Sequence, residues 1–157
     1  MWQKIKPYFV SVAIALAVGG LSAFLTKDNM DLYSRIQTPP LSPPSIVFPI
    51  VWTVLYALMG ISAASVFQNR QIDRDAANNG LITYGMSLAV NFFWSIIFFN
   101  AKAYLFAFVW LVCLLFLILR TILLYQKISP FAAYLQVPYA VWVTFAGYLN
   151  LFIAFLN

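Results

Sequence analysis

Apolar residues along this chain gather in five long runs that are separated by polar connections. A helix that crosses a membrane needs about 20 mostly apolar residues. The runs that meet this length lie at approximately residues 8–25, 46–67, 80–100, 103–124 and 131–156. The pattern predicts an all-α integral membrane protein, in which a bundle of five transmembrane helices forms a single membrane domain over residues 1–157. The first run follows Lys4 and Lys6, but it exceeds the ~7–15 apolar residues of a signal peptide, so we interpret it as a retained helix.

The connection over residues 27–45 is long and rich in proline, with the pairs Pro39-Pro40 and Pro43-Pro44. Proline fixes φ and lacks a backbone donor, so this segment is not expected inside a helix. Long loops in compact proteins are usually functional or disordered. The loop leads directly into the second apolar run, which carries Trp52 and Tyr56 near its start. This arrangement predicts a stiff loop at the mouth of a pocket.

Composition excludes several classes of protein. The chain is 64% hydrophobic and only 8% charged, whereas soluble domains carry about 25% charged residues. No basic cluster with interleaved aromatic residues lies in a polar segment, so we exclude nucleic-acid binding. The chain has no His and no Glu, and its four acids lie in polar connections: Asp28, Asp31, Asp73 and Asp75. We therefore expect no metal site, no cofactor, and no ion-coupled transport through ionisable groups inside the membrane.

Basic residues near the helix ends predict the orientation. With the N-terminus in the cytoplasm, six basic residues lie inside and three lie outside. The inner group is Lys4, Lys6, Arg70, Arg74, Arg120 and Lys127, and the outer group is Lys27, Arg35 and Lys102. A cytoplasmic N-terminus is therefore expected.

Three of the predicted helices each carry an indole or an amide on one narrow face. Spacings of three and four residues join Trp52 with Tyr56, and Ser87 with Asn91 and Trp94. The third stripe is Pro138, Trp142, Ala146 and Asn150. Aromatic residues also serve as anchors at membrane interfaces, and Asn also joins helices. If the stripes converge, they form an apolar, aromatic-lined cavity with a few amides, which is the usual form of a small-molecule site.

Three stretches resemble the signature of the translocator protein family, also called the tryptophan-rich sensory protein or peripheral benzodiazepine receptor family. They are PPSIVFPIVWTVLYALMG at 43–60, LAVNFFWSIIFF at 88–99 and PYAVWVTFAGYLN at 138–150, with Tyr33 placed before the prolines. The order and spacing of these stretches cover nearly the whole chain.

The resemblance implies a five-helix bundle, usually a homodimer, in a bacterial cell membrane, with a ligand cavity open toward the first loop. It also implies binding of porphyrins, notably protoporphyrin IX, and of isoquinoline carboxamide and benzodiazepine ligands. Carried over by motif, the ligand-binding residues are Tyr33, Pro43, Trp52, Tyr56, Ser87, Asn91, Trp142, Ala146 and Asn150. Leu41 and Ile46 stand where the family often has Trp, and NLFIAFLN after Leu149 lacks the Tyr and Lys or Arg of the cholesterol motif. Cholesterol binding is therefore not expected.

Three functions remain open from the sequence. The first is a membrane receptor that stacks a planar tetrapyrrole on Trp52 and Trp142, with Asn91 and Asn150 orienting its polar edges. The second is an enzyme that degrades protoporphyrin in light, in which Trp52 and Trp142 would be the catalytic residues. The third is a carrier of tetrapyrroles or other lipophiles. In the first case, Lys27 or Arg35 would be the nearest cations for the porphyrin propionates.

Overall fold

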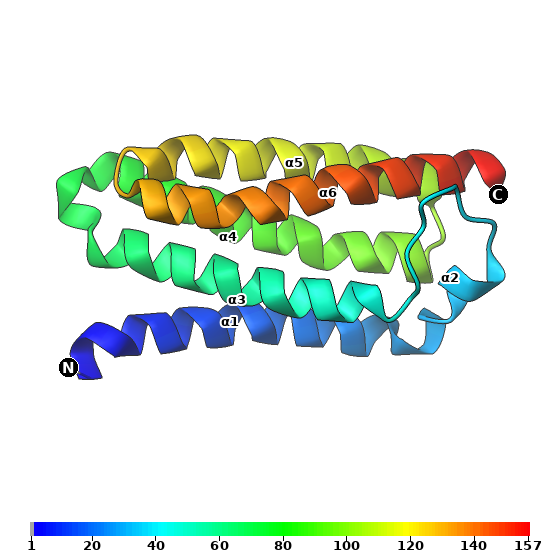
Figure 1. Cartoon of the computed structure of the whole chain (residues 1–157), viewed down its shortest axis with the longest axis horizontal. Coiled ribbons are helices and arrows are strands. Elements are labelled where there is room, and N and C mark those ends of the chain that lie inside the picture. Colours follow the sequence, from blue (N-terminus) through cyan, green and yellow to red (C-terminus); the bar gives the residue numbers. More distant parts are fainter. Residues whose placement is uncertain (1) are drawn as a thin grey trace.

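The structure is a computed structural model that describes residues 2–157, and it contains five long helices (Figure 1). The long helices are α1 (Trp2–Thr26), α3 (Val47–Gln68), α4 (Arg74–Ser95), α5 (Tyr104–Gln126) and α6 (Pro130–Leu156). The short helix α2 (Leu32–Arg35) lies in the first loop. Five helical segments are long and apolar enough to cross a membrane, and the described residues contain no strand. The prediction of an all-α, five-helix membrane bundle is confirmed.

The helices form a closed ring whose order differs from their order in the chain. α1 packs on α3, α3 on α6, α6 on α5, and α5 on α4, and α4 returns to α1. In Figure 1 the first loop and the C-terminus lie at one end of the bundle, which we call the loop end. The start of α1 and the connections after α3 and α5 lie at the other end, which we call the N-terminal end.

Several helix boundaries differ from the expected ones, and local chemistry explains two of them. The third long helix begins at Arg74 rather than near residue 80, because the Asp73 side chain accepts a hydrogen bond from the Ala76 backbone at 3.1 Å. The last begins at Pro130, where Ser129 accepts from the Ala132 backbone at 3.2 Å and proline suits the first helical position. α1 starts at Trp2 rather than near residue 8. α4 is followed directly by a π-helix, η3 (Ile96–Asn100).

α1 and α3 approach each other closely at Gly60. A Cβ atom built on Gly60 would lie only 2.5 Å from the Val12 Cα atom, so this crossing requires a residue without a side chain. Large apolar side chains such as Phe9, Phe116 and Phe155 are exposed. On a soluble protein these would be a liability, but they suit a surface that faces lipid.

Candidate functional site

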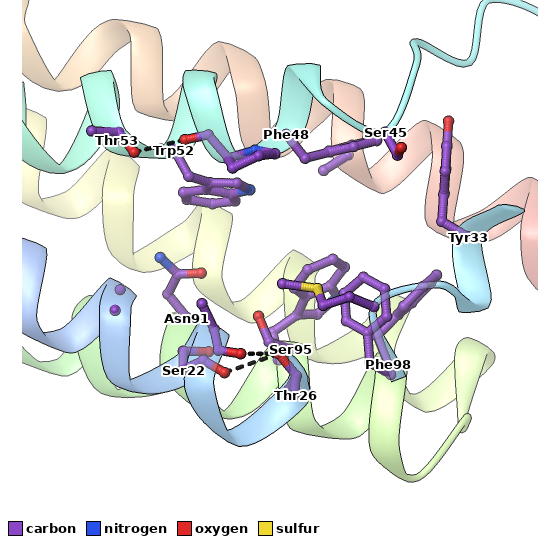
Figure 2. A pocket seen from close by; sticks show the side chains of 18 of the residues that line it. Ser22, Thr26, Tyr33, Ser45, Phe48, Trp52, Thr53, Asn91, Ser95 and Phe98 are labelled. Carbon is purple, nitrogen blue, oxygen red and sulfur yellow. Dashed lines mark hydrogen bonds between the residues drawn. The ribbon is translucent and has the colours of Figure 1, made fainter. Parts of the chain in front are cut away.

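A cavity of about 670 Å³ occupies the loop-end half of the bundle. Sites for drug-sized ligands are typically about 300–1,000 Å³. The walls come from α1, α3, α4, η3 and α6, and residues of the first loop complete the mouth. Figure 2 shows Trp52 on one wall, Asn91 with Ser22 and Thr26 on the other, and Tyr33 toward the loop. The lining is therefore mostly apolar, with a few polar groups held at fixed positions.

Two asparagine side chains are fixed by hydrogen bonds across the bundle. Asn91 of α4 donates from Nδ2 to the Tyr56 Oη of α3 at 3.0 Å. Asn150 of α6 accepts from the Trp94 indole N–H at 3.0 Å and donates to the Tyr104 carbonyl at 2.7 Å. Both amides are almost completely buried, so each bond forms in a medium of low polarity. The cavity keeps its shape because these polar groups are already partnered within the protein.

Aromatic rings form two opposing parts of the cavity lining. The Trp52 ring lies 5.6 Å from the Tyr56 ring and 6.2 Å from the Tyr139 ring, measured between centroids. On α4 the Trp94 ring stacks on Phe98 of η3 at 5.2 Å. Such contacts hold the indoles in place, so that a flat ligand would meet rings that are already ordered.

The first loop is tied to the loop end by hydrogen bonds to its backbone. The Tyr33 hydroxyl donates to the Pro43 carbonyl at 2.8 Å, and the Tyr33 ring packs edge-on against Phe48 at 5.0 Å. Burial raises the pKa of the Tyr33 phenol above its usual range, so it remains a donor at neutral pH. The Tyr148 hydroxyl donates to the Pro40 carbonyl at 2.7 Å.

A second attachment joins the loop to the end of α6. The Asn157 side chain donates to the Gln37 carbonyl at 2.9 Å and accepts from the Gln37 backbone N–H at 3.2 Å. The loop is thus held just before its proline segment, at Gln37, and within it, at Pro40 and Pro43.

Some of the residues of α1 and α3 that line the cavity are exposed. They are Gly20 and Ala23 of α1, and Pro49 and Thr53 of α3. The cavity lining is therefore partly accessible along these two helices.

Charged groups are scarce around the cavity. Asp31 lines the mouth and forms an exposed ion pair with Arg35 at 3.1 Å. The Lys27 ammonium lies 4.3 Å from the centre of the Phe24 ring, and neither Lys27 nor Arg35 lines the cavity. Residues 2–157 contain no cluster of His, Cys, Asp or Glu that could hold a metal ion.

The structure brings most of the sequence-predicted ligand residues together. Those that line the cavity are Tyr33, Trp52, Tyr56, Asn91, Ala146 and Asn150. Three others lie outside the lining. Pro43 serves through its carbonyl, which holds Tyr33. Ser87 is buried behind the wall and donates to the Tyr84 carbonyl of its own helix at 2.7 Å. The Trp142 ring packs between Phe48 and Phe145.

Sequence reasoning missed two groups of lining residues. Trp94 was placed on the face of Asn91 but was not assigned to the site, although its spacing already indicated the position. The second group comes from the first long helix: Leu16, Gly19, Gly20, Ser22, Ala23 and Thr26. A Cβ atom on Gly19 would lie 2.3 Å from the Tyr56 ring, so the glycine makes room for that wall. In the sequence, the Gly19-Gly20 pair was the feature that could have indicated a close contact on this helix.

Comparison with known proteins gives consistent matches over nearly the whole chain. The sequence model described as the TspO/MBR family matches residues 11–156. "Tryptophan-rich protein TspO" of Chlorobaculum tepidum is 34% identical, over 100% of this chain and 99% of that protein. "Protein CrtK" of Rhodobacter capsulatus is 33% identical, over 96% and 90%. "Translocator protein" of Homo sapiens is 30% identical, over 95% and 87%.

Proposed function

Since this chain belongs to the TspO/MBR family, we propose that it is a receptor that binds a flat hydrophobic molecule of the porphyrin type, such as protoporphyrin IX, in the cavity. Family membership and the five apolar helices make it an integral membrane protein, and membership supports a receptor or sensory role in general terms. The porphyrin assignment is the finer step that we add. This assignment names the class of ligand that the receptor would bind.

The observation that carries the proposal is the indole of Trp52 on the wall of a large apolar cavity. The Trp52 ring is held against Tyr56 and Tyr139, and it faces the opposite wall across open space (Figure 2). A planar macrocycle gains from stacking on such a ring and from removing apolar surface from water. The Asn91 and Asn150 side chains are the polar groups that would meet its edges.

The charged edge of a porphyrin would point toward the loop end. The mouth contains Asp31, and the Arg35 guanidinium is paired with it at 3.1 Å. Binding of a carboxylate would therefore draw on Arg35, whose pair with Asp31 is exposed and so contributes little stability. Lys27 and Lys102 are the other cations at this end.

A dark titration of protoporphyrin IX into the detergent-solubilised protein tests the assignment. We expect Trp52→Ala to weaken binding about tenfold or more, which corresponds to ~1.4 kcal/mol. Trp2→Ala is the matched control, because Trp2 is exposed at the far end of the bundle. Trp142→Ala should have a smaller effect than Trp52→Ala, because Trp142 does not line the cavity. An affinity that is unchanged in Trp52→Ala would overturn the proposed site.

A second function, light-dependent breakdown of the bound porphyrin, is favoured by one observation. Two oxidisable indoles, Trp52 and Trp94, line the cavity. The chemistry would come from the photo-excited porphyrin, molecular oxygen and an indole, since the described residues offer no metal cluster. On illumination, Trp52→Phe should retain porphyrin binding but slow the loss of porphyrin absorbance. Loss at the wild-type rate in both Trp52→Phe and Trp94→Phe would exclude a role for these indoles.

We also propose that the N-terminal end faces the cytoplasm of a bacterial cell, and that the protein acts as a homodimer. Six of the nine Lys and Arg residues were assigned to that end. Labelling of a cysteine placed at Gln126 from one side of sealed vesicles tests the orientation. Labelling of this cysteine only from the outside of whole cells would reverse it.

A further inference from the structure

The N-terminal half of the bundle contains a group of buried polar side chains without partners. They are Tyr84 of α4, Tyr125 of α5, and Gln136 and Tyr139 of α6, which we call the polar layer. Their exposed fractions are 7%, 0%, 1% and 1%. The three hydroxyl oxygens and both amide atoms of Gln136 form no hydrogen bond with any described residue. In a low-polarity interior, each such group costs about 1–3 kcal/mol if it stays unpaired.

The members of the polar layer lie at neighbouring levels of the bundle. Ser62 of α3 donates to the Ala132 carbonyl at 2.6 Å, and the Trp52 ring lies 6.2 Å from Tyr139, so these two contacts bracket Gln136 along α6. At about 1.5 Å per residue, Gln136 is roughly 4.5 Å from Tyr139 along the helix axis. All three tyrosines belong to the same core cluster.

Contacts between helices place the remaining two tyrosines. The Tyr139 hydroxyl lies near the side chains of Ser87 and Asn91 on α4, although no hydrogen bond joins them. α4 and α6 both start at the N-terminal end, so Gln136, three residues before Tyr139, is level with Tyr84, three residues before Ser87. A Cβ atom on Gly80 would lie 2.9 Å from the Tyr125 ring, which places Tyr125 one turn below Tyr84.

The chemistry of the polar layer indicates which kind of ligand it takes. Its groups are neutral hydroxyls and one amide, which both donate and accept hydrogen bonds. None of its four residues is charged, and basic residues of nearby helix surfaces, such as Arg120 and Lys127, are exposed; Arg120 donates to Thr83 at 3.3 Å. A metal ion or an anion would therefore lack a charged partner. Water fits, since a buried water typically makes about three hydrogen bonds to otherwise unpaired groups.

We propose that the polar layer is a hydration site, in which water bound between Tyr84, Tyr125, Gln136 and Tyr139 supplies their missing hydrogen bonds. The site is separate from the ligand cavity, whose lining includes none of the four residues. It lies directly beneath the wall formed by Tyr56 and Asn91, and it extends to the last turn of α5. Polar side chains thus extend from the cavity wall toward the N-terminal end of the bundle.

Pulsed X-ray radiolysis with mass spectrometry tests this proposal on the wild-type protein in detergent. Bound water yields hydroxyl radicals that modify adjacent side chains, even where bulk solvent does not reach. We expect the polar-layer tyrosines to be modified at least fivefold faster than Leu114 and Ile118, which are 0% exposed in the apolar core, after each rate is normalised to the denatured protein. Rates equal to those of the two controls would overturn the hydration site.

Two variants give independent readouts. In Gln136→Leu, modification of Tyr84 and Tyr139 should fall at least twofold, because the water loses its amide partner; unchanged rates would remove Gln136 from the site. Tyr84→Phe should lower the melting temperature about as much as Tyr56→Phe, whose hydroxyl is bonded to Asn91. A melting temperature that stays level or rises in Tyr84→Phe would show that its hydroxyl has no bound partner and would count against the proposal.

Discussion

The two halves of this bundle differ in how their largest buried polar side chains are partnered, although the Trp142 indole N–H toward the loop end is also unpaired. In the loop-end half, Asn91 and Asn150 are hydrogen-bonded to Tyr56, Trp94 and a backbone carbonyl, and they surround a cavity. In the N-terminal half, the tyrosines and glutamine of the polar layer have no protein partner. A cavity meant for a ligand needs walls that stay in place when it is empty, so the protein itself supplies their hydrogen bonds. A site that water can fill has no such requirement.

The largest expected effect contrasts how the two halves respond to one added methyl group. Gly60→Ala would place its Cβ about 2.5 Å from the Val12 backbone, which cannot move aside without separating α1 from α3. We expect a loss of about 1–3 kcal/mol in stability, or more, measured by thermal unfolding in detergent. Gly85→Ala is the matched control, because nothing lies within 4 Å of its Cβ position. In a helix this control should be neutral or stabilising. Equal melting temperatures for the two variants would contradict a close contact between α1 and α3 at Gly60.

A glycine-to-alanine change in the loop-end half, which contains the cavity, should affect ligand binding more than stability. A Cβ on Gly19 would lie 2.3 Å from the Tyr56 ring, but this ring borders the cavity and can swing into it. We expect Gly19→Ala to unfold at a temperature closer to wild type than Gly60→Ala, and to bind protoporphyrin IX about tenfold more weakly. Wild-type affinity in Gly19→Ala would show that the cavity tolerates the displaced ring.

A smaller effect measures how far the cavity wall is preorganised. Asn91→Ala and Tyr56→Phe each remove one side of a 3.0 Å hydrogen bond. A double-mutant cycle on unfolding should give a coupling energy of about 0.6–1 kcal/mol, since side-chain bonds in membrane proteins are modest. Strictly additive effects would mean that the bond does not hold the wall.

The smallest effect concerns the attachment of the loop at the cavity mouth. Asn157→Ala removes both hydrogen bonds to Gln37, which are exposed and so should change stability by less than about 0.5 kcal/mol. Amide exchange at residues 36–38 should accelerate severalfold, with exchange in α5 unchanged. Equal protection of the loop in wild type and variant would place the attachment elsewhere, at Tyr33 or Tyr148.

Ionisation of Tyr33 gives a separate test of that attachment. The folded protein raises the pKa of this phenol, so its contribution to stability is fully present below the unfolded pKa of about 10 and is lost as pH rises through the folded value. Loop protection that depends on Tyr33 should therefore decline only above about pH 10. Tyr33→Phe, which cannot donate to Pro43, should remove this pH dependence.

The number of helices and much of the cavity wall followed from the sequence, and physical reasons explain the rest. Runs of about 20 apolar residues are a strong signal in a membrane, so the five helices were correctly predicted. Spacing along one helix brought Trp52 together with Tyr56. It could not show how each helix is rotated against its neighbours, and for that reason Trp142 was assigned to a cavity that its ring does not line.

The role of the first long helix and of the polar layer depends on contacts between helices. Gly19 lines the cavity because of the position of Tyr56, which lies far away in the chain. Gln136 lies in the last apolar run, two residues before Pro138, but its lack of a partner appears only when the residues around it are known. No pattern within a single helix carries that information.

The π-helix at Ile96–Asn100 has a consequence for the register of the cavity wall. A π turn holds one more residue than an α turn, and such turns are frequent at functional sites. Here it lies between Trp94, fixed on Asn150, and Asn100, which donates to the Leu25 carbonyl at 3.1 Å. Phe98 and Phe99 line the cavity between these two anchors. Removing one residue within 96–100 should therefore turn one anchor by about 100° relative to the other, so that both hydrogen bonds could not be kept.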